Sequence, residues 1–224
     1  MDQRFLLLDT TYAISSYALA TERKGIVALQ HHTEAREQAV VINTVIETLL
    51  EENGWAYGDL SGIIICSGPG SYTGMRISYS VAKGLCYALD IPLVAVDRLS
   101  VLVSDQSVVS LVALFARTGE YFAGVHNGTE WLMSPRHCEA GELTAYLQEW
   151  SPQQLITDVV PDGWQDGRMV TVLPADLQQP LDMGRLGVLG MARHAAGIFE
   201  DIAYCEPLYL KSVYTTVPGK KSIL

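Results

Sequence analysis

The chain has 224 residues, 49% of them hydrophobic, which is enough to bury one large core or the cores of two small lobes. Its formal net charge of −10 at pH 7 weighs against a large nucleic-acid surface of its own, because such a surface needs clustered Lys and Arg. No apolar stretch approaches the roughly 20 residues that cross a membrane, and the N-terminus has no signal-peptide pattern. We therefore expect a cytoplasmic protein that does not bind membranes. Its four cysteines form no CxxC pair, so neither a zinc knuckle nor a redox motif is indicated.

The first hundred residues combine a meander of three strands with crossover units. A purely apolar, β-branched run at 63–65 is typical of a strand that is covered on both faces. From residue 34 to residue 52 the apolar residues follow helical spacing, and Asn53-Gly54 ends that helix. We expect strands at 5–8, 14–20, 25–30, 63–65 and 93–96, and helices at 34–52, 73–89 and 98–103.

The second half repeats this order more weakly. We expect strands at 108–115, 121–126, 131–134 and 155–160, helices at 139–150 and 185–199, a loop-rich segment at 161–180 and an extended tail from residue 207. The order of elements resembles that of the actin, sugar kinase and heat-shock ATPase superfamily, which implies two RNase H-like lobes. We therefore expect an α/β protein with mixed sheets flanked by helices. Its N-terminal lobe should cover 1–104, and a degenerate C-terminal lobe should cover 105–224.

The string between the apolar run and the second helix carries the strongest signal. It is not a Walker A loop, because Gly74 is followed by Met75 and Arg76 instead of Lys and Ser or Thr. Nor is it a dinucleotide fingerprint, since the three glycines are spaced one residue too far apart. It resembles the G-P-G-S-[FY]-T-G-x-R signature of the TsaB family, also called YeaZ or glycoprotease-like, at Gly68, Pro69, Gly70, Ser71, Tyr72, Thr73, Gly74 and Arg76. The glycines alone would also fit a loop that merely turns the chain tightly, and we expect neither Gly70 nor Gly74 to accept a large side chain.

The resemblance covers most of the first lobe and part of the tail. Further segments that match the family pattern are 8–11, 82–85, 91–96 and 206–211. The chain departs from the family in its first helix, where a His-Ser or His-Thr pair and a Pro are usual and Gln38, Ala39 and Thr44 stand instead. These departures concern the way a partner is recognised more than the fold.

The resemblance implies a non-catalytic subunit that supports threonylcarbamoyl transfer to N6 of adenosine 37 in tRNAs that read codons beginning with A. The implied partners are a TsaD-like catalytic subunit and a TsaE-like ATPase, with tRNA bound only through the complex and a homodimer when the chain is alone. ATP or ADP is a candidate cofactor at the interface of the complex. The alternative is an enzyme, either a glycoprotease-like peptidase or a nucleotide-hydrolysing or kinase member of the superfamily.

The turn after the first strand is the candidate nucleotide site. Asp9, Thr10 and Thr11 lie where ATPases of the superfamily hold phosphates and a hydrated metal. The same residues would also serve simply to cap the turn. A second phosphate turn is expected at 117–120, but there the Asp of the family is replaced by Phe115. This replacement removes a carboxylate that nucleotide hydrolysis would use.

No metal site or catalytic centre is predicted from the histidines. His31 and His32 are adjacent, so their side chains point apart, whereas two ligands on one helical face need a separation of four residues. The other histidines stand alone at His126, His137 and His194.

The two long helices carry more apolar surface than one sheet can cover. A helix on one sheet needs an apolar arc of about 100°, but the apolar residues here span roughly half of the circumference. The additional surface would be buried beneath the second lobe or against another subunit, and the resemblance implies pairing with a second copy or with TsaD. The predicted interface comprises Val41, Val45, Leu49, Met75, Tyr79, Ala82, Lys83 and Cys86. Val45 and Tyr79 are the positions predicted to point outward.

Overall fold

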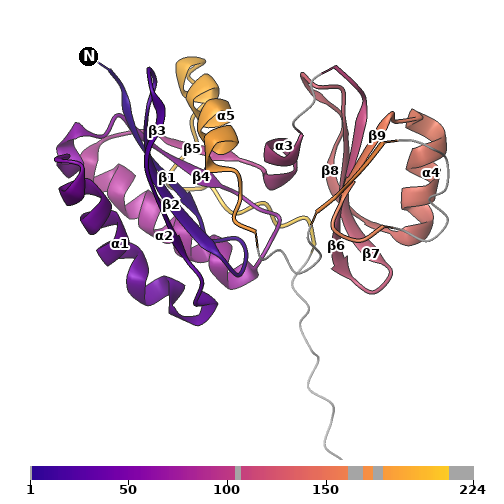
Figure 1. Cartoon of the computed structure of the whole chain (residues 1–224), viewed down its shortest axis with the longest axis horizontal. Helices are drawn as coiled ribbons and strands as arrows, with labels where there is room; N and C mark the ends of the chain where they lie inside the picture. Colours follow the sequence, from indigo (N-terminus) through magenta and orange to yellow (C-terminus); the bar gives the residue numbers. More distant parts are fainter. Residues whose placement is uncertain (1, 104–106, 161–168, 174–178, 212–224) are drawn as a thin grey trace, which may run out of the picture.

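The structure, a computed structural model, describes residues 2–103, 107–160, 169–173 and 179–211, and it divides into two lobes (Figure 1). The first sheet has the strand order β3-β2-β1-β4-β5. The meander β1–β2–β3 is antiparallel, and β4 and β5 continue the sheet parallel to β1. Its strands are β1 (Arg4–Asp9), β2 (Ser15–Thr21), β3 (Gly25–His32), β4 (Gly62–Cys66) and β5 (Leu93–Val96). The predicted mixed sheet is confirmed.

Helices cover both faces of the first sheet. On one face lie α1 (Gln38–Glu52), preceded by the short 3₁₀ helix η1 (Ala35–Glu37), and α2 (Tyr72–Leu89). A second 3₁₀ helix, η2 (Tyr57–Asp59), leads into β4. On the opposite face lies α5 (Met183–Ala195), which buries Met183 and Leu186 against β1, β4 and β5. The central strands are therefore apolar on both faces, as the run at 63–65 indicated.

The second sheet repeats the topology of the first. Its order is β10-β9-β6-β7-β8, which corresponds strand for strand to the first sheet when each lobe is numbered from its own first strand. The elements are β6 (Ser110–Arg117), β7 (Glu120–His126), β8 (Trp131–Glu139), α4 (Ala140–Trp150), β9 (Gln154–Thr157) and β10 (Met169–Val172). The strand β10 corrects the sequence prediction, which placed these residues in a loop. Its β-branched residues Val170, Thr171 and Val172 pair with β9 in parallel register.

The helix that follows each sheet packs against the other sheet, so the two lobes exchange their last helices. The short helix α3 (Arg98–Leu102) follows the first sheet but places Leu99, with the adjoining Val103, in a core cluster of the second sheet, while its Val101 stays in a core cluster of the first. The indole N–H of Trp131 also donates to Ser100 Oγ at 3.1 Å. Conversely, α5 follows the second sheet and packs on the first (Figure 1). A helical pattern shows that a face is apolar, but it does not show which sheet covers that face.

After α5 the chain stays with the first lobe and does not continue as helix to residue 199. Gly197 has a positive φ of 71°, a conformation that ends helices, and α5 stops at Ala195. The backbone then pairs with the edge strand, since Glu200 N donates to Leu93 O at 2.9 Å. Ile202 and Cys205 pack against the core beneath α1 and α2. Across the described ranges, no helix combines the length and the apolar character that a membrane span requires.

Candidate binding site at the lobe junction

The signature loop leaves the carboxyl end of β4 and begins α2. Gly68 adopts a positive φ of 101°, and its carbonyl oxygen accepts a hydrogen bond from Arg98 N at 2.7 Å. Ser71 is the N-cap of α2, since its Oγ accepts from Gly74 N at 3.2 Å. The loop is thus held at one end by a main-chain hydrogen bond and at the other by the side-chain cap of α2.

Gly70 and Gly74 allow this loop to lie directly on the turn that follows β1. An added Cβ at Gly70 would overlap the carbonyl oxygen of Thr11, and one at Gly74 would overlap that of Thr10. Neither glycine has a positive φ, which the structure places at Gly68 instead. The close approach of two backbones is therefore the physical reason why neither glycine should accept a large side chain.

The Asp9 turn is closed by an ion pair that the sequence reading missed. Arg98 Nη1 lies 3.4 Å from Asp9 Oδ2 and donates to Thr11 Oγ1 at 3.1 Å. Thr11 donates to Asp9 Oδ1 through both its backbone N–H, at 2.9 Å, and its hydroxyl, at 2.6 Å. The Arg98 guanidinium also stacks on the ring of Tyr12 at 3.7 Å. Arg98 is 3% exposed and Asp9 is fully buried, so this is a buried, internally paired charge cluster.

This arrangement changes the interpretation of the candidate nucleotide residues. Asp9, Thr10 and Thr11 all have no exposed surface. The hydroxyl of Thr10 is occupied as well, since it donates to Gly74 O at 2.6 Å. A nucleotide could contact these residues only if the signature loop moved away. In the described conformation their side chains are engaged within the turn and with the signature loop, and the nucleotide role stays a prediction.

The second lobe contributes a buried carboxylate at the equivalent edge of its sheet. Asp158 follows β9, and its Oδ1 accepts from Phe115 N at 2.7 Å. Burial raises the pKa of Asp158, and it raises the pKa of Tyr12 across the junction to about 12. Neither Asp158 nor Arg98 was predicted from the sequence as a residue of this site. The carboxyl ends of parallel strands are where α/β proteins gather such groups, and this rule was the available signal for Asp158.

The predicted partner interface is placed mostly inside the first lobe. The side chains of Val45 and Tyr79 are 7% and 4% exposed, so the prediction that they point outward is wrong. Both belong to the core between the helices and the sheet, together with Leu49, Ala82 and Cys86. The remaining predicted residues are Met75, which is buried against the signature loop, Lys83, whose Nζ donates to Cys205 O at 3.0 Å, and Val41, which is half-buried. Outward apolar side chains on these helices are instead Val40 and Tyr87, 78% and 82% exposed.

The two adjacent histidines of β3 contact side chains on opposite faces of the strand. His31 Nδ1 lies 2.9 Å from Ser16 Oγ, and His32 Nε2 lies 3.8 Å from Glu37 Oε2, on the other side of β3. Within the residues that the structure describes, no group of three or more His, Cys, Asp or Glu side chains is placed to hold a metal ion.

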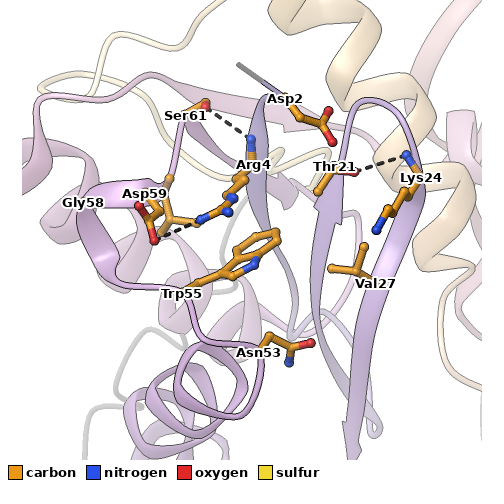
Figure 2. A pocket seen from close by; sticks show the side chains of 11 residues that line it. Asp2, Arg4, Thr21, Lys24, Val27, Asn53, Trp55, Gly58, Asp59 and Ser61 are labelled. Atoms are coloured by element: carbon orange, nitrogen blue, oxygen red, sulfur yellow. Dashed lines mark hydrogen bonds and ion pairs between the residues drawn. The ribbon is translucent and has the colours of Figure 1, made fainter.

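A pocket of about 780 Å³ opens at the end of the first sheet opposite to the signature loop (Figure 2). Part of its polar wall is paired internally. Arg4 Nη1 lies 3.0 Å from Asp59 Oδ2, and the same guanidinium stacks on the ring of Trp55 at 4.8 Å. None of the predicted site residues lines this pocket.

A pocket of about 470 Å³ lies between the lobes and does include part of the signature. The first lobe contributes Pro69, Gly70, Tyr72 and Met75, the second lobe contributes Arg117 and Phe122, and the tail contributes Leu208, Tyr209, Leu210 and Lys211. The signature loop, the C-terminal tail and the second lobe therefore form the walls of one pocket.

Comparison with known proteins agrees with the signature. A family model described as "TsaD: tRNA N6-adenosine threonylcarbamoyltransferase" matches residues 13–149, more than half of the chain. The chain belongs to this family, on its TsaB branch. The protein of Escherichia coli (strain K12) named tRNA threonylcarbamoyladenosine biosynthesis protein TsaB is 25% identical, over 97% of this chain and 100% of that protein. The protein of the same name in Bacillus subtilis (strain 168) is 34% identical, and that match spans 54% of either chain.

A solved structure confirms the fold. It is described as an uncharacterized protein with similarity to peptidase YEAZ from Pseudomonas aeruginosa, and it superposes with a TM-score of 0.76. The match covers 93% of this chain and 100% of that one at 22% sequence identity. The two-lobed α/β fold expected from the order of elements is thus shared with this protein.

Proposed function

We propose that the chain is a non-catalytic subunit of the cytoplasmic machinery that attaches threonylcarbamoyl to N6 of adenosine 37 in tRNAs that read codons beginning with A. The observation that carries this proposal is the similarity to proteins named for threonylcarbamoyladenosine biosynthesis, over nearly the whole length of the chain. Catalysis belongs to a TsaD-like subunit in this proposal, and a TsaE-like ATPase acts on the complex. The net charge of −10 is consistent with tRNA being held mainly by the partners.

The closed turn after β1 supports a partner role over an enzymatic one. A superfamily ATPase needs a carboxylate that is free to hold a hydrated metal beside the phosphates. Here both oxygens of Asp9 are engaged, one with Arg98 and one with Thr11, beneath the signature loop. Any ATP or ADP would accordingly bind at an interface with another subunit.

Reconstitution tests this function directly. Purified TsaD and TsaE homologues, a threonylcarbamoyl-adenylate synthase, unmodified tRNA, ATP, threonine and bicarbonate would be combined with the chain, or with an equal mass of serum albumin as the control. Mass spectrometry of the tRNA nucleosides should show the modified adenosine only when the chain is present. Equal modification with albumin would eliminate the subunit role. ATP hydrolysis or peptide cleavage by the chain alone at ordinary enzymatic rates would favour the enzymatic alternative.

A further inference from the structure

Residues 206–211, here called the strap, cross from the first lobe to the second. They have the sequence Glu-Pro-Leu-Tyr-Leu-Lys and pass through the lobe junction. On the first lobe the strap is bound to the end of β4, where Leu208 N donates to Ser67 O at 2.9 Å. Just before the strap, Cys205 O accepts from Lys83 of α2. At its other end Lys211 contacts the Glu120 carboxylate of β7.

The middle of the strap is held by the last residue of the signature. Arg76 Nε donates to the hydroxyl of Tyr209 at 3.0 Å, and its Nη2 contacts the hydroxyl of Tyr72. The guanidinium lies over both rings, 4.0 Å from the centroid of Tyr72 and 6.0 Å from that of Tyr209. The two rings pack together with centroids 5.0 Å apart. One planar cation thus joins two aromatic side chains, one at the start of α2 and one in the strap.

The anchor on the second lobe is a carboxylate with three donors. Glu120 accepts from Arg117 Nε at 2.7 Å and from His137 Nε2 at 2.6 Å, in addition to Lys211. These hydrogen bonds, chiefly the one from Arg117, lower the pKa of Glu120 to about 2. The carboxylate therefore stays charged at neutral pH and keeps its attraction for Lys211.

The strap also divides the space between the lobes. Leu208 and Tyr209 line the pocket of about 470 Å³ beside the signature loop. The same two residues line a second pocket of about 410 Å³, which is bounded by Trp131 of the second lobe and Arg193 of α5. A segment that forms a wall of both pockets fixes the size of each.

We propose that Arg76 is a positioning residue that seats the strap between the lobes, and that the strap, through Lys211 and Glu120, sets the width of the groove at the lobe junction. The signature and the tail motif 206–211 would then be one structural unit, which explains why both stand out in the sequence. The packing of α3 on the second sheet keeps the lobes attached in any case, so the strap controls the groove and not the cohesion of the molecule. This inference does not rest on the proposed function.

Hydrogen exchange of the full-length chain, followed by mass spectrometry, tests the clamp without any partner. Arg76→Ala should speed exchange in peptides covering 206–211 by roughly two- to fivefold, the size expected when an exposed hydrogen bond from a charged donor is lost. Exchange at the Glu120 end of β7 should rise as well, because Lys211 is released. The α1 and β4 peptides should not change. Arg36→Ala, which removes an exposed arginine from η1, is the matched control and should leave all of these peptides unaffected.

A double-mutant cycle tests whether Arg76 and Tyr209 act through their contact with each other. Tyr209→Phe keeps the ring but removes the hydroxyl that accepts from Arg76, so it should give part of the Arg76→Ala effect. Adding it to Arg76→Ala should change nothing further, whereas independent structural roles would add. Unchanged exchange of the strap in either single variant, fully additive effects, or a released strap with an unaffected β7 would each overturn the proposal. If Arg76→Ala fails to fold, the hydrogen exchange of the strap in Tyr209→Phe alone tests the proposal.

Discussion

Gly74 lies where two turns of the first lobe touch, and it shows how a single missing side chain sets the geometry of the junction. Gly74→Ala would place a Cβ against the carbonyl oxygen of Thr10. We expect this variant to lose about 1–3 kcal/mol of stability, the usual cost of overpacking a site that cannot relax. Gly84→Ala in the same helix meets no atom within 4 Å and should gain about 0.5–1 kcal/mol from helix propensity. Urea denaturation measures both, and equal midpoints for the two variants would contradict the close packing of the turns.

Arg98 is the second residue on which the junction depends, because it neutralises a fully buried carboxylate. Arg98→Met would leave Asp9 charged and unpaired, which costs about 3–5 kcal/mol in comparable sites. Adding Asp9→Asn should recover part of this loss, because the orphaned charge is then gone. Arg4→Met is the matched control: its pair with Asp59 is partly exposed, and the loss should stay within about 1 kcal/mol. A double variant no more stable than Arg98→Met alone would argue against the paired charge as the cause.

At the scale of elements, α5 is the helix whose partner the sequence did not reveal. Leu186 is fully buried against the first sheet, while Val188 on the same helix is 56% exposed. Leu186→Ala should therefore cost about 2–5 kcal/mol, through lost apolar burial and the cavity left behind. Val188→Ala should change stability by about 0.5 kcal/mol or less. Thermal and urea unfolding of the two variants would check the assignment, and similar losses for both would contradict the packing of α5 on this sheet.

The elements themselves were largely predictable, because hydrophobic periodicity and turn residues act locally. The meander, the long helices and the apolar strand at 63–65 lie where their patterns placed them. The strand β10 was missed because it is short and follows a segment rich in Gly and Pro, where the turn signals dominated. The exchange of α3 and α5 was missed for another reason: it depends on contacts between residues far apart in the chain, and no local pattern encodes them.

The candidate site was predictable only in part. The signature loop and the Asp9 turn were both singled out, and the structure brings them together. The ion pair between Arg98 and Asp9 could not be predicted from the sequence, because Arg98 stands alone in a short apolar segment and lies beside Asp9 only in the folded chain. The outward direction of Val45 and Tyr79 was wrong because a helical wheel gives the width of an apolar arc but not the side on which the sheet lies.

At the scale of the whole molecule, the outer face of α1 and α2 remains the predicted pairing surface, with one exposed apolar residue near the start of α1 and another near the end of α2. Val40 and Tyr87 are large apolar side chains that are almost fully exposed in the single chain. Two copies related by a twofold axis could bring this face against itself, and a TsaD-like partner with similar helices could use the same face. Self-association and partner binding would then compete by mass action.

Charge substitutions on this face should therefore weaken both assemblies together. In Val40→Glu and Tyr87→Glu the new carboxylate would be buried unpaired against whichever partner covers it, and that cost does not depend on the identity of the partner. We expect each variant to fold normally, because both positions are exposed, and to shift both dissociation constants upward by roughly tenfold or more. Sedimentation velocity with and without a TsaD homologue measures the two equilibria. Leu29→Glu is the control and should leave them unchanged, because Leu29 is 47% exposed and its cross-strand partner Ala18 belongs to the core on the α5 face of the sheet. Folded helix variants that still dimerise and bind the partner as tightly as the unmodified chain would eliminate this face as the interface.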